Sequence, residues 1–204
     1  MHLEGQVAFI TGAARGQGRN HALRLAERGV DIIALDINAS IGTVAYDGPT
    51  AEDLAETVRL VEATGRRILA READVRDVDA VRAVVDEGVD AFGRLDIAIP
   101  NAGIASIASA REMSDQMWKD MIDINLNGAW HGVTAALPHM KADGTGGSIV
   151  LVGSVASFKG LPNLVHYVTA KHGIIGMTKT LAAELGPERI RVNAVCPTNV
   201  DTPM

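Results

Sequence analysis

The chain contains little cysteine and few aromatic residues. Of its 204 residues one is cysteine, and phenylalanine, tryptophan and tyrosine together make up 3%. A single cysteine excludes an intramolecular disulfide and is typical of a reducing, cytoplasmic setting. Cys196 ends an apolar stretch of strand length, so we expect it in the core rather than as a nucleophile.

Long apolar runs and basic clusters are also missing. The apolar runs are far shorter than the about 20 residues of a membrane-spanning helix. Residues 1–5 lack a basic region followed by an apolar segment, so no signal peptide is expected. A net charge of −6 without a basic cluster argues against nucleic acid as a partner. The histidines show no metal-ligand spacing such as H-E-x-x-H, so no metal site is expected.

Apolar residues make up 47% of the chain, enough to fill a sheet between two helical layers. Strand-length apolar runs alternate with helical patterns, without repeats or low-complexity linkers. We therefore predict a single α/β domain over residues 1–204, with a doubly wound, Rossmann-type parallel sheet and helices on both faces. The clearest predicted helices are 50–64, the stretch after Asp77, 115–140 and 165–185. The clearest predicted strands are 95–99 and 148–152.

The first apolar run, residues 6–10, leads into the glycine-rich turn T-G-A-A-R-G-Q-G and then into helical spacing. Free amides and the helix dipole at such a turn bind phosphates. The spacing is G-x-x-x-G-x-G rather than G-x-G-x-x-G, and a glycine-rich turn is often only a turn. The strand before it and an acidic residue after the next strand favour cofactor binding. The turn residues expected to contact the cofactor are Gly12, Arg15, Gly16, Gln17 and Gly18.

That acidic residue is Asp36, which closes the second apolar run. It lies 18 residues beyond Gly18, near the roughly 20-residue offset at which a carboxylate binds the adenosine ribose. A carboxylate accepts hydrogen bonds from the 2′-hydroxyl and repels a 2′-phosphate, which favours NAD over NADP. Arg15 points the other way, because a basic residue in the turn could meet a 2′-phosphate. We give Asp36 the greater weight, since a carboxylate beside that phosphate would be unfavourable.

Tyr167 and Lys171 lie four residues apart, so they share one face of a helix, and Ser154 lies thirteen residues upstream of the tyrosine. A nearby ammonium favours the phenolate and lowers a tyrosine pKa towards that of a working general base. A serine hydroxyl can hold the oxygen on which charge develops. By itself, a Tyr-x-x-x-Lys pair usually has no catalytic role: the tyrosine packs and the lysine is a solvated charge. The glycine-rich turn and Asp36 earlier in the chain favour a catalytic role here.

Together these residues resemble the short-chain dehydrogenase/reductase family. The matching motifs are Thr11-Gly12-x-x-x-Gly16-x-Gly18, Asp74-Val75, Asn101-Ala102-Gly103, Asn125, Ser154, Tyr167-x-x-x-Lys171 and Arg191-Val192-Asn193. The match extends from residue 5 to the last residue, and the joint occurrence is far more specific than any one motif. Pro100 and Thr198 replace an Asn and a Gly that are common in the family, which bears on local backbone geometry but removes no chemical group.

The resemblance implies a role for each matching residue. Tyr167 would be the general base and also contact the cofactor, and Lys171 would bind the ribose and lower the tyrosine pKa. Ser154 would orient the substrate oxygen, and Asn125 would hold a water in a proton relay. The further cofactor contacts that the resemblance implies are Ile37 beside Asp36, Asp74 and Val75 at the adenine, Asn101, Ala102 and Gly103 under the ribose and nicotinamide, and Pro197, Val200 and Thr202, the last at the carboxamide.

The resemblance predicts an NAD-dependent oxidoreductase that interconverts a small secondary alcohol and a ketone by hydride transfer. The family's four-helix contact implies a homo-oligomer, a dimer or tetramer.

A 3-oxoacyl thioester reductase would share every site residue, but it would be expected to use NADPH and to carry a basic patch for its acyl carrier. A cofactor-sensing protein without turnover would not need the four catalytic residues together. A Ser-His-Asp hydrolase is disfavoured because the sequence around Ser154 lacks the second glycine of G-x-S-x-G.

The segment 37–49 is longer than a usual strand–helix connection and directly follows Asp36. We expect it to fold over the adenosine half of the cofactor; the alternative is a surface insertion without a role. Together with the turn G-A-A-R-G-Q-G-R-N-H, it resembles the carveol-dehydrogenase-like subgroup, in which NAD is held tightly and recycled by the peptide-derived redox cofactor mycofactocin. The family continues past the position of Met204 into a substrate-covering segment and a last strand. We therefore expect these residues to be part of a longer protein; the alternative is a shortened form.

Overall fold

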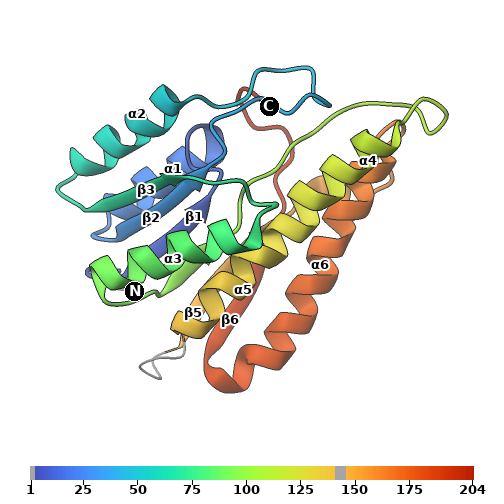
Figure 1. Cartoon of the computed structure of the whole chain (residues 1–204). Helices are drawn as coiled ribbons and strands as arrows, with labels where there is room; N and C mark the ends of the chain where they lie inside the picture. The colour runs from blue at the N-terminus through green and yellow to red at the C-terminus, as the bar shows by residue number, and fades with distance from the viewer. Residues whose placement is uncertain (1–2, 141–145) are drawn as a thin grey trace.

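The structure, a computed structural model, describes residues 3–140 and 146–204. Within these residues six parallel strands form one sheet in the order β3-β2-β1-β4-β5-β6 (Figure 1). The strands are β1 (Val7–Thr11), β2 (Asp31–Asp36), β3 (Ile68–Glu72), β4 (Ile97–Ile99), β5 (Gly147–Val152) and β6 (Ile190–Val195). The predicted Rossmann-type parallel sheet is confirmed.

Helices cover both faces of the sheet (Figure 1). They are α1 (Gly16–Ala26), α2 (Ala51–Glu62), α3 (Val78–Phe92), α4 (Asp115–Ile122), a π-helical turn (Asp123–Asn127), α5 (Gly128–Met140) and α6 (Val165–Leu185). Alternate residues of β1 and β2 point to two separate cores. Phe9 and Ile33 pack with α3, α5 and α6, whereas Ile10 and Ile32 pack with α1 and α2. Both strands are therefore buried along their whole length and apolar at their central residues, as expected of a parallel sheet buried on two sides.

The helix ends follow the capping rules. Thr50 caps α2 and forms a capping box with Asp53, and Asp77 caps α3 through the amides of the first turn. Gly93 ends α3 in the left-handed region at φ 82°. The predicted helix 165–185 has those bounds, whereas the stretch predicted as one helix over 115–140 is interrupted by the π-helical turn.

The strand order reverses between β1 and β4, so the chain leaves these neighbouring strands in opposite directions. A crevice forms at the carboxyl ends of the strands beside such a reversal, which is where open parallel sheets bind ligands. The glycine-rich turn follows β1 and residues 100–103 follow β4 at this edge. No helix in the described part of the chain is long and apolar enough to cross a membrane.

Candidate active site

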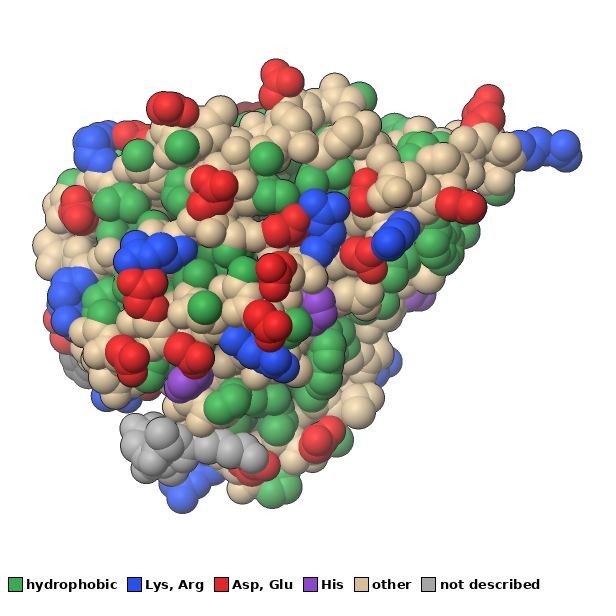
Figure 2. Space-filling model, viewed as in Figure 1, with side chains coloured by type: hydrophobic (Ala, Val, Ile, Leu, Met, Phe, Trp, Pro, Cys, Tyr) green, Lys and Arg blue, Asp and Glu red, His purple; other side chains and the backbone are tan. Residues whose placement is uncertain are grey.

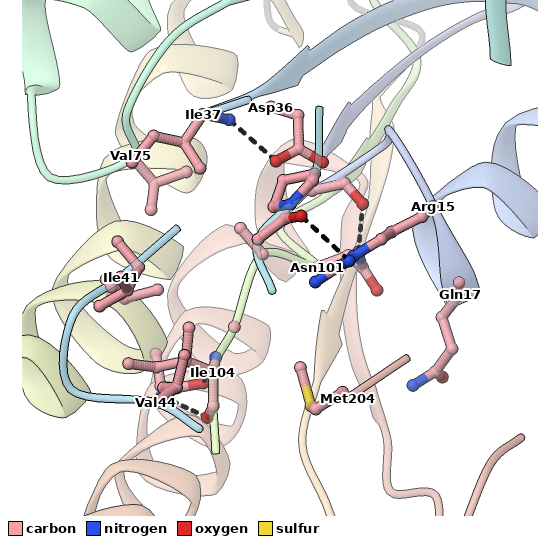
Figure 3. A pocket seen from close by; sticks show the side chains of 18 of the residues that line it. Arg15, Gln17, Asp36, Ile37, Ile41, Val44, Val75, Asn101, Ile104 and Met204 are labelled. Carbon is pink, nitrogen blue, oxygen red and sulfur yellow. Dashed lines mark hydrogen bonds between the residues drawn. The ribbon is translucent and has the colours of Figure 1, made fainter. Parts of the chain in front are cut away.

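A cavity with an empty volume of about 1120 Å³ opens at the carboxyl ends of the strands (Figure 3). Its wall contains most of the residues predicted from the sequence: Gly12, Arg15, Gly16, Gln17, Asp36, Ile37, Asp74, Val75, Asn101, Ala102, Gly103, Asn125, Tyr167, Lys171 and Thr202. Four predicted residues lie outside the wall, and these are Gly18, Ser154, Pro197 and Val200.

The glycine-rich turn folds as its residues require. Gly12 and Gly16 have φ angles of 68° and 54°, in the region that favours glycine. A Cβ on Gly18 would lie 1.9 Å from the carbonyl oxygen of Gly12, so this glycine lets α1 approach the end of β1 closely. No side chain caps the N-terminus of α1, and its first-turn residues Gly16 and Gln17 line the cavity. The free amides of this turn suit an anionic ligand.

Hydrogen bonds join the turn after β1 to the segment after β4. Thr11 Oγ1 accepts from the amides of Asn101 and Ala102 at 3.0 and 2.9 Å. The Asn101 side chain donates to the carbonyls of Thr11 and Gly12 at 3.0 and 3.2 Å. The backbone and side-chain amides of Asn101 therefore hold the two walls of the crevice together.

The two departures from the common family pattern fit the structure without strain. The Pro100 ring lies beside Gly132 of α5, where a Cβ would be 3.2 Å from the proline Cγ. Within the described residues, the non-glycine residues with positive φ are Asn38, Asn163 and Arg189. Thr198 therefore does not adopt the conformation that would disfavour a threonine.

Asp36 is 7% exposed at the end of β2. Its carboxylate accepts hydrogen bonds from the amides of Ala14 and Ile37, both at 2.8 Å. Burial raises the pKa of Asp36, while these two amide hydrogen bonds act in the opposite direction. A carboxylate offers about four lone-pair sites, so two amide bonds leave it able to accept from ligand hydroxyls.

The Arg15 guanidinium reaches the long loop between β2 and α2. It donates to the carbonyls of Asp47 and Gly48 at 2.6 and 3.2 Å. The sequence left a 2′-phosphate open as a partner of Arg15. The partners in the structure are loop carbonyls, which neither spacing nor periodicity could indicate.

The long loop, residues 37–49, has further attachments. Thr43 Oγ1 donates to Asp120 of α4 at 2.8 Å, and the Tyr46 hydroxyl accepts from the Ala105 amide at 3.0 Å. The side chains of Ile41 and Val44 face the cavity (Figure 3). The loop thus forms one wall of the cavity, and the residues there that were not predicted individually are Ala39, Ile41, Val44, Tyr46, Gly48 and Pro49.

Lys171 is buried at the other end of the cavity. Its ammonium donates to the carbonyl of Val152 at 2.9 Å and lies 5.7 Å from the centre of the Tyr167 ring. Burial lowers the pKa of Lys171 from 10.5 to about 8. The predicted helical face shared by Tyr167 and Lys171 therefore exists and faces the cavity.

Asn125 and Gly103 complete this end of the cavity. Asn125 lies in the π-helical turn, and its side chain exchanges hydrogen bonds with the backbone of Ile104 at 3.1 and 3.0 Å. A Cβ on Gly103 would lie 2.6 Å from Asn125 Oδ1 and 3.7 Å from Lys171 Nζ. A side chain at this position would displace the Asn125 amide, so the glycine lets the segment after β4 pass close to Asn125. Single-turn π-helices are frequent at functional sites.

Ser154 is 9% exposed and follows β5. Its hydroxyl accepts from the Ala156 amide at 3.2 Å and caps the short 3₁₀ turn Val155–Ser157. Ser157 donates to the carbonyl of Lys171 at 2.8 Å, so this turn is fastened to α6. His166 is fully buried with its Nε2 2.9 Å from Ser106 Oγ and packs beside the cavity rather than lining it.

Comparisons with known proteins agree with this geometry. The family model for short chain dehydrogenase matches residues 6–204. The (-)-trans-carveol dehydrogenase of Rhodococcus erythropolis is 49% identical over 203 residues, which cover 99% of this chain and 73% of that protein. A 3-oxoacyl-[acyl-carrier-protein] reductase of Thermotoga maritima is 37% identical over 100% of this chain and 78% of that protein. The crystal structure of carveol dehydrogenase from Mycobacterium avium in complex with NAD has a TM-score of 0.98 and 53% identity, covering 100% of this chain and 74% of that one.

The buried Lys171 ammonium predicts a specific pH dependence of stability. Between about pH 8, the folded pKa, and 10.5, the ordinary value, the unfolded chain binds more protons, so the free energy of unfolding rises with pH. The shift corresponds to roughly 3 kcal/mol. Lys171→Met lacks this titration. Urea denaturation without cofactor should therefore show the wild type gaining up to this amount relative to the variant as pH rises through this window. A pH-independent difference would contradict the buried ammonium.

Proposed function

Because this chain belongs to the short-chain dehydrogenase family, we propose that it is an NAD-dependent oxidoreductase that interconverts a secondary alcohol and a ketone by hydride transfer. The proposal rests on one observation: a single cavity joins the glycine-rich turn and Asp36 to Tyr167, Lys171 and Asn125. Residues 1–204 form its cofactor-binding domain in this proposal.

The residues at the first end of the cavity suit a dinucleotide. The N-terminus of α1 has no side-chain cap, so its first-turn amides are available to a diphosphate. Asp36 provides a carboxylate for ribose hydroxyls. A bound NAD would supply the hydride acceptor and donor, while the protein supplies orientation and the proton-transfer groups.

The other end holds the proton-transfer residues of the proposal. Tyr167 takes the hydroxyl proton of the alcohol or returns it to the ketone. The Lys171 ammonium has donors beyond the one used by Val152, and in this proposal these serve the ribose and the Tyr167 oxygen. Ser154 orients the substrate oxygen. Asn125 fixes the backbone of Ile104 and holds the water of the proton relay.

A 3-oxoacyl thioester reductase remains the second candidate, because a relative of that name aligns over the whole chain. Such an enzyme would be expected to bind NADPH and an acidic acyl carrier. Asp36 disfavours the 2′-phosphate of NADPH. On the face shown in Figure 2, the basic side chains are interspersed with acidic ones and form no continuous basic patch. The alcohol dehydrogenase assignment is therefore the better supported.

Tyr167→Phe keeps the ring and removes the hydroxyl. We expect NAD affinity to stay near that of the wild type, because the cofactor contacts are unchanged. Turnover of a secondary alcohol should fall by about a hundredfold or more, because the proton-transfer group is lost. Steady-state kinetics with a panel of secondary alcohols and calorimetric titration of NAD measure the two effects. Near-normal turnover would exclude Tyr167 as the acid/base group.

Asp36→Ala should shift cofactor preference towards NADP. The substitution removes the negative charge and frees the amides of Ala14 and Ile37, which can then donate to a 2′-phosphate. The ratio of kcat/KM for NADP to that for NAD should rise by about tenfold or more. Asp36→Asn, which keeps the shape without the charge, is the matched control and should shift the ratio in the same direction. A wild type that already prefers NADP would refute the role of Asp36.

The attachments of the long loop predict slow release of the cofactor. If residues 37–49 cover bound NAD, purified protein should retain NAD through dialysis, and mass spectrometry of the extracted ligand detects it. Turnover with free NAD should then be poor, and an artificial electron acceptor that reoxidises bound NADH in place should restore it. Replacing residues 42–48 by a tight turn should speed exchange. Fast exchange in the unmodified protein would contradict a covering role.

A further inference from the structure

The chain has two tyrosines, and both line the same cavity. Tyr167 comes from α6 and has a role in the proposed reaction. Tyr46 comes from the long loop, and nothing in that reaction uses it. Since phenol hydroxyls are hydrogen-bonding groups, the position of Tyr46 bears on what the cavity binds.

Tyr46 lies at the same end of the cavity as Lys171. Its oxygen is 3.0 Å from the amide of Ala105, two residues beyond Gly103. Gly103 in turn lies against Asn125 and Lys171. The loop begins beside Asp36 and reaches the segment after β4 at Ala105, so it brings a phenol close to the residues that follow Gly103.

The Tyr46 hydroxyl has hydrogen-bonding capacity to spare. It accepts from the Ala105 amide, which fixes the oxygen, and its own proton needs an acceptor. The two carboxylates that line the cavity have other partners: Asp36 binds two amides, and Asp74 pairs with Arg76. Burial raises the pKa of Tyr46, so the phenol is protonated and acts as a donor at neutral pH.

The loop holds this hydroxyl in place before any ligand binds. Thr43 fastens one side of the loop to Asp120, and Arg15 fastens the other side through the carbonyls of Asp47 and Gly48. A group fixed in this way loses little conformational entropy when it binds a ligand.

We propose that Tyr46 is a further cofactor-binding residue, whose hydroxyl donates a hydrogen bond to an oxygen of the dinucleotide beyond its AMP half. The acceptor is an oxygen of the second phosphate or of the nicotinamide ribose. This proposal rests on the proposed function, since it requires a dinucleotide in the cavity. It makes the long loop a contributor to binding at the redox end as well as a cover over the adenosine.

The test is a ligand-truncation series on Tyr46→Phe, which removes the hydroxyl and keeps the ring. Calorimetric titration of nucleotide-stripped protein with AMP, ADP, ADP-ribose and NAD locates the contact. We expect AMP affinity within about twofold of the wild type and NAD affinity about tenfold or more weaker. A loss first seen with ADP assigns the contact to the second phosphate, and one first seen with ADP-ribose assigns it to the ribose.

Thr43→Val is the matched control, because it releases the same loop from Asp120 without altering the phenol. We expect it to change the affinities for all four ligands by a similar factor. Thermal unfolding without ligand confirms that both variants fold. If Tyr46→Phe weakens AMP as much as NAD, the phenol only positions the loop and the proposal is wrong. Unchanged affinity for all four ligands also overturns it. A wild type that binds none of them refutes the proposed function itself.

Discussion

The site depends on the hydrogen bonds between the ends of β1 and β4. Thr11 and Asn101 exchange side-chain and backbone bonds across the reversal of strand order. These bonds fix the glycine-rich turn against the segment 101–104, and Asn125 fixes the far side of that segment. Both ends of the cavity are therefore attached to the same rigid edge of the sheet. This edge fixes the positions of the binding groups relative to the reacting groups.

The opposite wall of the cavity is formed by the long loop between β2 and α2. Residues 37–49 contact the glycine-rich turn through Arg15, helix α4 through Thr43 and the segment after β4 through Tyr46. Each contact uses one or two hydrogen bonds, individually worth about 1 kcal/mol. The three attachments together therefore hold the loop against the cavity more firmly than any one of them would.

Most of the fold and the position of the site could be predicted from the sequence, because parallel strands bring their carboxyl ends to one edge of the sheet. That rule and the motif spacing placed the glycine-rich turn and Asp36 at one edge of the sheet. The family resemblance added the Tyr167–Lys171 pair, which lines the same cavity. Long-range contacts were not predictable. Arg15 binds carbonyls more than thirty residues away, and the π-helical turn interrupts a stretch whose periodicity predicted one helix. Periodicity reports which face is buried, not which backbone group a side chain meets.

The central claim is that one dinucleotide spans the cavity from Asp36 to Lys171. A crystal structure of the wild-type protein with NAD tests it most directly. The account predicts the adenosine ribose at Asp36, the diphosphate at the first turn of α1, and the nicotinamide beside Tyr167 and Lys171. Electron density that shows NAD in the reverse orientation, or bound outside this cavity, would contradict the account.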